Sequence, residues 1–226
     1  MMLHLPSVLT SAQLTEIRQH LQQTTWQNGA ISAGQQAAQR KHNLQLDSRS
    51  PATQTLAEIV RAALMQQPMF VSAVLPKQVL MPSFNCYQEG GQYGNHVDAA
   101  IQFDALTRLP VRTDVSTTVF LSEPEEYEGG ELIVEDTYGC HEVKLAAGDA
   151  VIYSATSLHR VEPVTQGQRL AAFLWTQSMV RDEWQRHMLF NLDMTILRLR
   201  QQLQDSPEVI ALTSHYHNLL RQWIEL

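Results

Sequence analysis

The chain is poor in cysteine and has no surplus of basic residues, and each absence excludes a class of protein. Its two cysteines, Cys86 and Cys140, form no CxxC pair. A chain of 226 residues can also bury an adequate core without disulfides, so a disulfide scaffold is not expected. Lys and Arg number 16 against 23 Asp and Glu, a formal net charge of −7. That sign argues against nucleic acid as a partner, because such binding needs a basic face.

Long apolar stretches are missing as well. The longest wholly apolar run, residues 170–175, is far shorter than the roughly 20 residues that span a bilayer. The first residues contain no basic region followed by an apolar one, which a secretory signal requires. We therefore expect a cytoplasmic protein with no membrane partner.

Helical periodicity marks both ends of the chain. Residues 10–23 place Leu14, Ile17 and Leu21 three and four positions apart, and residues 53–65 carry a similar stripe that starts behind Ser50-Pro51 and closes at Pro68. Two further helices follow residue 181, separated by residues 205–208. Their apolar stripes predict a hairpin that covers an edge of the sheet. The alternative for the same stripes is a subunit interface in a homo-oligomer.

Between these ends the apolar period changes from 3.6 to 2. The β-rich stretches are residues 80–87, 96–103, 115–122, 131–136, 141–145, 150–154, 160–164 and 169–177. Short strands at this spacing, separated by glycine turns, are typical of a sandwich or jelly roll. The sequence thus predicts a mainly β core with flanking helices (α+β). We divide it into an N-terminal helical support region (1–77), a β core (78–178) and a C-terminal helical region (179–226).

One histidine and one aspartate have the spacing of metal ligands. His96 and Asp98 are separated by a single residue, so in a strand both would point to one face while Val97 faces the opposite layer. A third ligand must come from another strand, and His159, which begins a predicted strand, is the candidate. Two imidazoles and one carboxylate on one face of an octahedron are the arrangement of non-haem iron(II) oxygenases, which leaves three positions open for chemistry.

The open positions suit a 2-oxo acid together with dioxygen. If the acid is 2-oxoglutarate, its far carboxylate needs a buried cation with planar, two-point geometry. Arg169 follows His159 by ten residues, and with residues 166–168 as a turn an antiparallel pairing would return it to the metal end of the barrel. The alternative for Arg169 is an ordinary strand arginine with an exposed head.

These residues resemble a known family. The pattern Tyr87-x-x-Gly90-x-x-Tyr93-x-x-His96-x-Asp98, followed by His159 and Arg169, resembles the prolyl-4-hydroxylase-like branch of the Fe(II)/2-oxoglutarate dioxygenases. The fuller string of residues 75–99, LPKQVLMPSFNCYQEGGQYGNHVDA, resembles the bacterial PKHD-type hydroxylases, also called the PiuC/YbiX family. The resemblance extends over nearly the whole chain, including the helical ends.

The resemblance implies a double-stranded β-helix (jelly roll) that binds Fe(II) through His96, Asp98 and His159 and anchors 2-oxoglutarate through Arg169. It also implies that the Tyr87 hydroxyl contacts 2-oxoglutarate, that Trp175 forms an aromatic wall of that pocket, and that ascorbate keeps the iron ferrous. Many prolyl hydroxylases carry lysine at the position of Arg169, so the prolyl substrate does not transfer. A link to bacterial iron acquisition suggests a siderophore or peptide as substrate.

The leading hypothesis is a dioxygenase that couples decarboxylation of 2-oxoglutarate, with release of succinate and carbon dioxide, to hydroxylation of a small-molecule or peptide substrate. A non-catalytic metal- or ligand-binding jelly-roll sensor is the alternative, since it needs the three ligands but not Arg169. A related oxidase that desaturates or cyclises its target is a third reading. The acidic segment 123–131 is interpreted as a solvated turn, with contact to a cationic substrate as the alternative.

Overall fold

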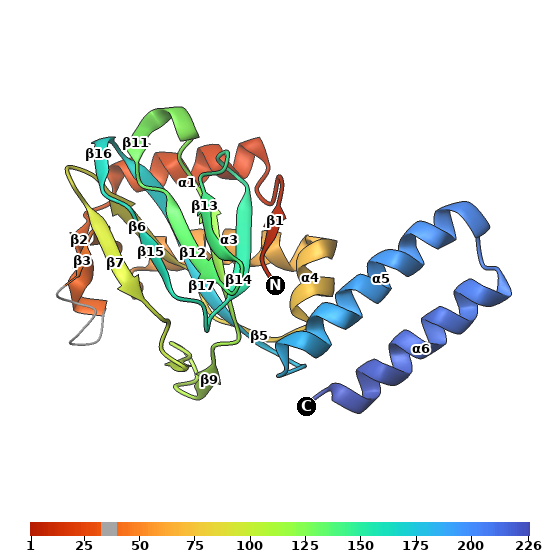
Figure 1. The fold of residues 1–226 in the computed structure, drawn as a ribbon. Helices are drawn as coiled ribbons and strands as arrows, with labels where there is room; N and C mark the ends of the chain where they lie inside the picture. The colour runs from red at the N-terminus through yellow and green to blue at the C-terminus, as the bar shows by residue number, and fades with distance from the viewer. Residues whose placement is uncertain (33–39) are drawn as a thin grey trace.

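The computed structural model describes residues 1–32 and 40–226, which form three layers. Helices cover one face of a large sheet, and a smaller sheet lies over its other face (Figure 1). The predicted mainly β core between helical ends is confirmed. Within the described residues, no helix has both the length and the apolar character of a membrane span.

The large sheet has eight strands in the order β1-β14-β10-β17-β6-β4-β2, with β5 also paired to β17. Every pairing in it is antiparallel. Its strands are β1 (Leu3–Leu5), β2 (Gln27–Asn28), β4 (Leu44–Gln45), β5 (Pro76–Val79), β6 (Ser83–Tyr87), β10 (Val115–Phe120), β14 (Ala150–Ser154) and β17 (Arg169–Ser178). Strands therefore occur within residues 1–77 as well, which the sequence patterns described as helical.

The smaller sheet has five strands in the order β13-β12-β15-β7-β3, and the described residues also form two two-stranded ribbons. Its strands are β3 (Lys41–His42), β7 (Gln92–His96), β12 (Leu132–Asp136), β13 (Gly139–Val143) and β15 (His159–Val161). One ribbon pairs β8 (Ile101–Phe103) with β9 (Pro110–Arg112), and the other pairs β11 (Tyr127–Gly129) with β16 (Val164–Gly167). Two predicted strands, 96–103 and 160–164, are each divided between two observed strands.

Alternation along the large sheet separates the apolar core from the cavity face. On β17, Ala172 and Leu174 pack into the core beneath the helices, whereas Arg169, Phe173 and Trp175 line the space between the sheets. The same alternation on β6 points Phe84 toward the helices and Tyr87 into the cavity. Because successive strand residues point to opposite faces, one strand can serve both purposes.

The helices are α1 (Ser11–Gln23), α3 (Pro51–Gln66), α4 (Pro68–Val74), α5 (Glu183–Leu203) and α6 (Pro207–Trp223), with short 3-10 turns at Gly29–Ser32 and Pro124–Glu126. Thr10 caps α1 with a capping box. The interpretation of Pro68 as a helix stop was wrong in part, because Pro68 is the first residue of α4. Proline lacks the N–H that a first-turn residue would leave unbonded, so it starts a helix as readily as it ends one.

The C-terminal hairpin of α5 and α6 projects away from the β core (Figure 1). Its base packs on Leu75 and Val180 through Leu189 of α5 and through the apolar side of α6. Ser72 of α4 also hydrogen-bonds Asp193 of α5 at 2.5 Å. The prediction that this hairpin covers a sheet edge was wrong: its anchor is α4 and the residues that follow β17.

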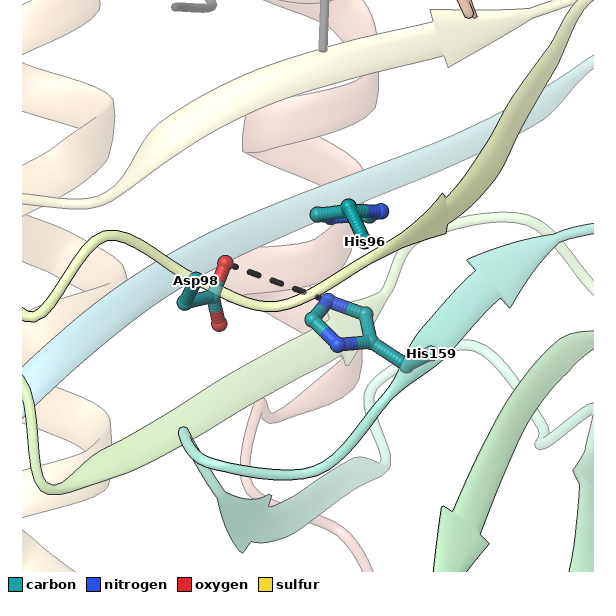
Figure 2. A group of neighbouring side chains, drawn as sticks. All are labelled: His96, Asp98 and His159. Atoms are coloured by element: carbon teal, nitrogen blue, oxygen red, sulfur yellow. Dashed lines mark ion pairs between the residues drawn. The ribbon is translucent and has the colours of Figure 1, made fainter. Parts of the chain in front are cut away.

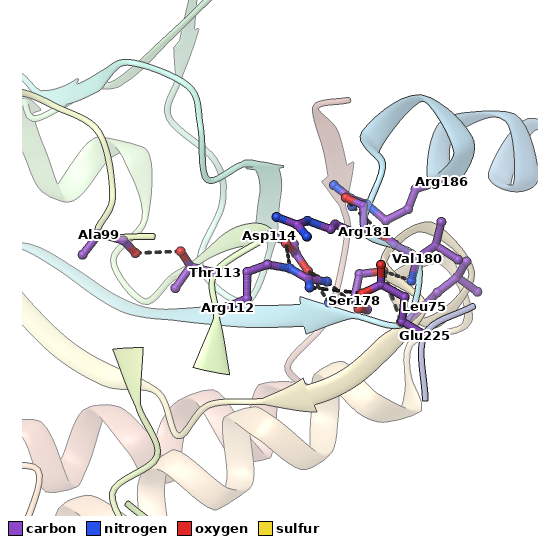
Figure 3. A network of polar contacts seen from close by, with 10 residues as sticks. All are labelled: Leu75, Ala99, Arg112, Thr113, Asp114, Ser178, Val180, Arg181, Arg186 and Glu225. Atoms are coloured by element: carbon purple, nitrogen blue, oxygen red, sulfur yellow. Dashed lines mark hydrogen bonds and ion pairs between the residues drawn. The ribbon is translucent and has the colours of Figure 1, made fainter. Parts of the chain in front are cut away.

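A polar network fastens this base to the core (Figure 3). Arg112 donates two hydrogen bonds to Asp114, at 2.7 and 3.0 Å, and Asp114 also accepts the Ser178 backbone N–H at 2.9 Å. The other guanidinium nitrogen of Arg112 lies 3.3 Å from Glu225, beyond the end of α6. Buried Arg186 of α5 donates hydrogen bonds to the backbone carbonyls of Val180 and Arg181, which follow β17, at 2.8 Å each. The end of α6 is thus bonded to β9 through Glu225, and the start of α5 is bonded through Arg186 to the segment that links it to β17.

Replacing Asp114 with alanine is expected to lower the free energy of unfolding by about 2–4 kcal/mol, because Arg112 and a buried backbone N–H lose their acceptor together. Urea denaturation measures the change. Asp136→Ala is the matched control, since Asp136 pairs with His141 at the surface and should cost no more than about 1 kcal/mol. Equal losses in the two variants would contradict this assignment.

Candidate metal centre and its cavity

Three potential metal ligands converge between the two sheets. The ligand atoms of His96, Asp98 and His159 all lie within 4.8 Å of one another (Figure 2). Nε2 of His159 is 3.8 Å from Oδ1 of Asp98, and the two imidazole centroids are 4.1 Å apart. The pairing of β15 with β7 sets His159 directly opposite His96, which explains how residues far apart in the chain meet.

The strand argument for Asp98 was wrong in one respect. Strand β7 ends at His96, so Asp98 lies in the loop beyond it, and Val97 is 51% exposed instead of packed in a layer. The backbone turn after the strand, and not simple alternation, brings the carboxylate beside the imidazoles. Thr113 of the β9–β10 connection holds this loop by donating to the Ala99 carbonyl at 2.7 Å (Figure 3).

Backbone carbonyls orient both imidazoles. Nδ1 of His96 is 2.8 Å from the Gly94 carbonyl, and Nδ1 of His159 is 3.0 Å from the Ser157 carbonyl. Since a carbonyl can only accept, each Nδ1 donates its proton, and Nε2 of each ring is the nitrogen that a metal can use. Burial, together with the charge of His159, lowers the pKa of His96 to about 4. His96 is therefore neutral near pH 7, as a metal ligand must be.

The carboxylate of Asp98 is oriented by Ser116. The hydroxyl of Ser116, on β10 of the large sheet, donates to Oδ2 of Asp98 at 2.5 Å. This bond occupies one carboxylate oxygen and leaves Oδ1 toward His159. The sequence offered no signal for Ser116, because it becomes a neighbour of Asp98 only when the two sheets face each other.

Ser116→Ala is expected to weaken binding of a divalent metal by about 10- to 100-fold, because the Asp98 carboxylate loses the bond that orients it. Calorimetric titration with Mn(II) measures the affinity. Ser154→Ala on the adjacent strand β14 is the control, since the Ser154 hydroxyl bonds to Thr156. Wild-type affinity in Ser116→Ala would remove this serine from its positioning role.

A buried guanidinium lies in the same cavity. Arg169 is only 1% exposed and begins β17 opposite Tyr87 on β6. Its guanidinium carbon lies 5.4 Å from the ring centroid of Tyr87 and 5.2 Å from that of Phe120. Among the described residues its Nε has no hydrogen-bond partner and no carboxylate forms an ion pair with it. A buried cation in this state suits an anionic ligand, since burial of an unpaired charge is unfavourable.

Arg169 reaches the cavity by a route that differs from the predicted one. The strand after residues 159–161 does not fold back on them; instead β16 pairs with β11, and β17 pairs with β6 and β10 in the opposite sheet. Arg169 thus faces the metal ligands from across the barrel. The alternative of an arginine with an exposed head was wrong.

Tyr87 and Trp175 also line this cavity, which has a volume of about 940 Å³. Burial raises the pKa of Tyr87 to about 12, so its hydroxyl keeps its proton and can donate. Trp175 lies opposite Ser116 in the β10–β17 pair, and its ring meets that of Phe173 edge to face at 5.6 Å. Lys41 and Asn85, neither of them predicted from the sequence, belong to the same lining. Alternation was the available signal for Asn85, because it shares the cavity face of β6 with Tyr87.

The acidic segment 123–131 lies elsewhere. Glu126 forms an ion pair with Arg18, and Glu123 accepts the Ala147 backbone N–H. Neither they nor any other acidic residue of this segment is among the described residues that line the cavity. The interpretation as a solvated turn agrees with this arrangement.

Comparison with known proteins gives matches for both the β core and the C-terminal helices. The model for the 2OG-Fe(II) oxygenase superfamily matches residues 82–177, and the model for the PKHD-type hydroxylase C-terminal domain matches residues 183–225. A PKHD-type hydroxylase of Hyphomonas neptunium is 61% identical over 225 residues, covering 100% of both chains. The PKHD-type hydroxylase PiuC of Pseudomonas aeruginosa is 48% identical over 226 residues, again covering 100% of both.

Solved structures share the fold at lower identity. A Pseudomonas putida prolyl-4-hydroxylase is 20% identical with a TM-score of 0.51, covering 78% of this chain and 92% of its own. A Trichoplax adhaerens prolyl hydroxylase, solved with a peptide fragment of hypoxia inducible factor, is 16% identical with a TM-score of 0.55, covering 83% and 86%. These likenesses confirm the predicted double-stranded β-helix.

Proposed function

The chain belongs to the PKHD-type hydroxylase family, and we propose that it binds Fe(II) through His96, Asp98 and His159 and 2-oxoglutarate through Arg169. Its oxygenase core and its relatives make it an Fe(II)- and 2-oxoglutarate-dependent dioxygenase, an oxidoreductase. The relatives carry hydroxylase names, so the non-catalytic sensor has no support.

One observation carries the residue assignment: two imidazoles and a carboxylate meet within 4.8 Å, in the same cavity as a buried guanidinium without a carboxylate partner among the described residues. This donor set suits Fe(II), and the guanidinium suits a dicarboxylic acid whose other end reaches the metal. Catalysis is assigned to residues 78–178, with residues 1–77 and 179–226 as supporting regions.

When bound, Fe(II) supplies the activation of dioxygen through which 2-oxoglutarate becomes succinate and carbon dioxide and a substrate C–H bond is hydroxylated. The chain's own contribution is to position and to exclude water. Arg169 and the Tyr87 hydroxyl hold the far carboxylate of the co-substrate. Trp175 forms an apolar wall, and the backbone carbonyls behind both imidazoles keep Nε2 directed into the site. Desaturation or cyclisation needs the same residues, so only the product distinguishes these outcomes.

Anaerobic addition of Fe(II) and then 2-oxoglutarate tests the assignment. We expect a visible charge-transfer absorption that needs both additions, because the co-substrate must chelate the metal. An absence of this band in the wild-type protein would overturn the proposed site. A band that survives in His96→Ala would overturn the ligand set alone.

Three finer points belong to the same proposal. We expect ascorbate to prolong succinate production, as it does where iron must be kept ferrous; total succinate with and without ascorbate measures this. A reducing compartment such as the cytoplasm suits ferrous iron and the free thiols of Cys86 and Cys140. The projecting α5–α6 hairpin would form the subunit interface of a homo-oligomer. The other proposed partners are a small-molecule or peptide substrate and dioxygen.

A further inference from the structure

A second buried cation faces the cavity from the other sheet. Lys41, in β3, lies opposite Tyr93 of β7 and is only 6% exposed. Its ammonium lies 5.2 Å from the ring centroid of Tyr93 in the small sheet and 5.8 Å from that of Phe173 in the large sheet. The ammonium therefore lies in the gap between the sheets, and it lines the same cavity as the metal ligands.

The register places this ammonium between the two ends of the cavity. Phe173 follows Arg169 by four residues on the cavity face of β17 and precedes Trp175, which is opposite Ser116 at the metal end. Tyr93 stacks on His96 with the ring centroids 3.6 Å apart. Lys41 thus contacts Tyr93, the ring neighbour of His96, and Phe173, which is four residues from Arg169 along β17. The two cations also contact different rings of the cavity: Tyr87 and Phe120 lie beside the guanidinium, and neither of the rings beside the ammonium is among them.

The charge of the cavity lining is opposite to that of the whole chain. The protein carries a net charge of −7, yet the described residues lining the cavity include three basic side chains, Arg40, Lys41 and Arg169, and one acidic side chain, Asp98. A bound divalent metal adds two positive charges and 2-oxoglutarate adds two negative charges, so these contributions cancel. The excess of basic over acidic groups therefore persists in the loaded site. A lining of this sign favours an anionic ligand in addition to the co-substrate.

A polar ligand is favoured independently by Asn85. Its side chain is 8% exposed, it shares the cavity face of β6 with Tyr87, and its Oδ1 has no hydrogen-bond partner among the described residues. Unbonded polar atoms this deeply buried are rare in native proteins. An amide oxygen can only accept, so Asn85 favours a hydrogen-bond donor on the ligand, whereas the ammonium of Lys41 favours an anionic group.

We propose that Lys41 binds a carboxylate in the middle of the cavity, distinct from the one anchored by Arg169, and that the primary substrate is therefore a carboxylic acid. This inference rests on the proposed function, because it takes the metal and co-substrate sites as assigned above. The same carboxylate chemistry is available from the 1-carboxylate of 2-oxoglutarate, and the experiment separates the two sources.

The first arm measures binding without turnover. Anaerobic Fe(II)-loaded wild type, Lys41→Met, Lys41→Arg and the exposed-lysine control Lys77→Met are titrated with 2-oxoglutarate through the charge-transfer band. For a substrate carboxylate, we expect the dissociation constant of Lys41→Met to stay within about twofold of wild type. A rise of about thirtyfold, reversed in Lys41→Arg, would assign Lys41 to the 1-carboxylate instead. A wild type without the band would indicate failure of the proposed function, not of this inference.

The second arm uses metabolite extract divided on an anion-exchange resin. Each fraction is incubated with enzyme, Fe(II), 2-oxoglutarate and ¹⁸O₂, and labelled products are measured by mass spectrometry. We expect label only in compounds that the resin retains, reduced about thirtyfold in Lys41→Met but not in Lys41→Arg or Lys77→Met. The proposal is overturned if Lys41→Met binds 2-oxoglutarate as wild type does and no retained anion is labelled in a Lys41-dependent way.

Discussion

His159→Ala is expected to weaken binding of a divalent metal by at least about a hundredfold and to reduce succinate production to background. The reason is that two ligands, His96 and Asp98, remain on one short segment and no longer surround an ion. Calorimetric titration with Mn(II) gives the affinity, and succinate released under air gives the turnover.

His141→Ala is the matched control for this loss. His141 lies on β13 of the same small sheet, but its imidazole pairs with Asp136 at the surface, 2.8 Å away. It should bind metal and produce succinate as the wild type does. If His159→Ala binds metal normally, the assignment of the third ligand is wrong.

Arg169→Leu is expected to raise the dissociation constant of 2-oxoglutarate by about 30- to 1000-fold while metal affinity stays unchanged. The buried guanidinium has no carboxylate partner among the described residues, so the ligand carboxylate is the partner that the variant loses. The charge-transfer band measures the co-substrate and calorimetry measures the metal. In the same variant, 2-oxoglutarate should no longer raise the melting temperature of the Mn(II)-loaded protein.

Two further variants sharpen this result. Arg169→Lys keeps the charge but not the planar pair of donors, so it should recover part of the affinity. Arg160→Leu removes a strand arginine whose ion pairs with Glu135 and Glu162 lie at the surface, and it should leave 2-oxoglutarate affinity unchanged. An Arg169→Leu protein with wild-type affinity would place the co-substrate elsewhere in the cavity.

Local patterns in the sequence predicted the elements that depend on local chemistry. The strand at residues 150–154 follows from a short apolar run between turns, and the helix behind Ser50-Pro51 follows from its proline start; the structure has both where expected. The sequence predicted that the third ligand comes from a separate strand. It did not predict that β7 and β15 are paired neighbours.

Other features depend on which strands become neighbours, and no single segment encodes that. Asp98 lies beyond its strand, Arg169 enters from the opposite sheet, and Ser116 meets Asp98 only across the barrel. Lys41 belongs to a two-residue strand too short for any periodic signal. Such residues become recognisable once the sheet order is known.

The alternation on β17 constrains how the protein can change its length. Arg169, Phe173 and Trp175 share one face of that strand, while Ala172 and Leu174 pack beneath the helices. Inserting one residue after Arg169 would rotate the two aromatic rings into the helix-facing core and turn small apolar side chains toward the metal. Between Arg169 and Trp175, we therefore expect single-residue insertions and deletions to be tolerated far less readily than substitutions.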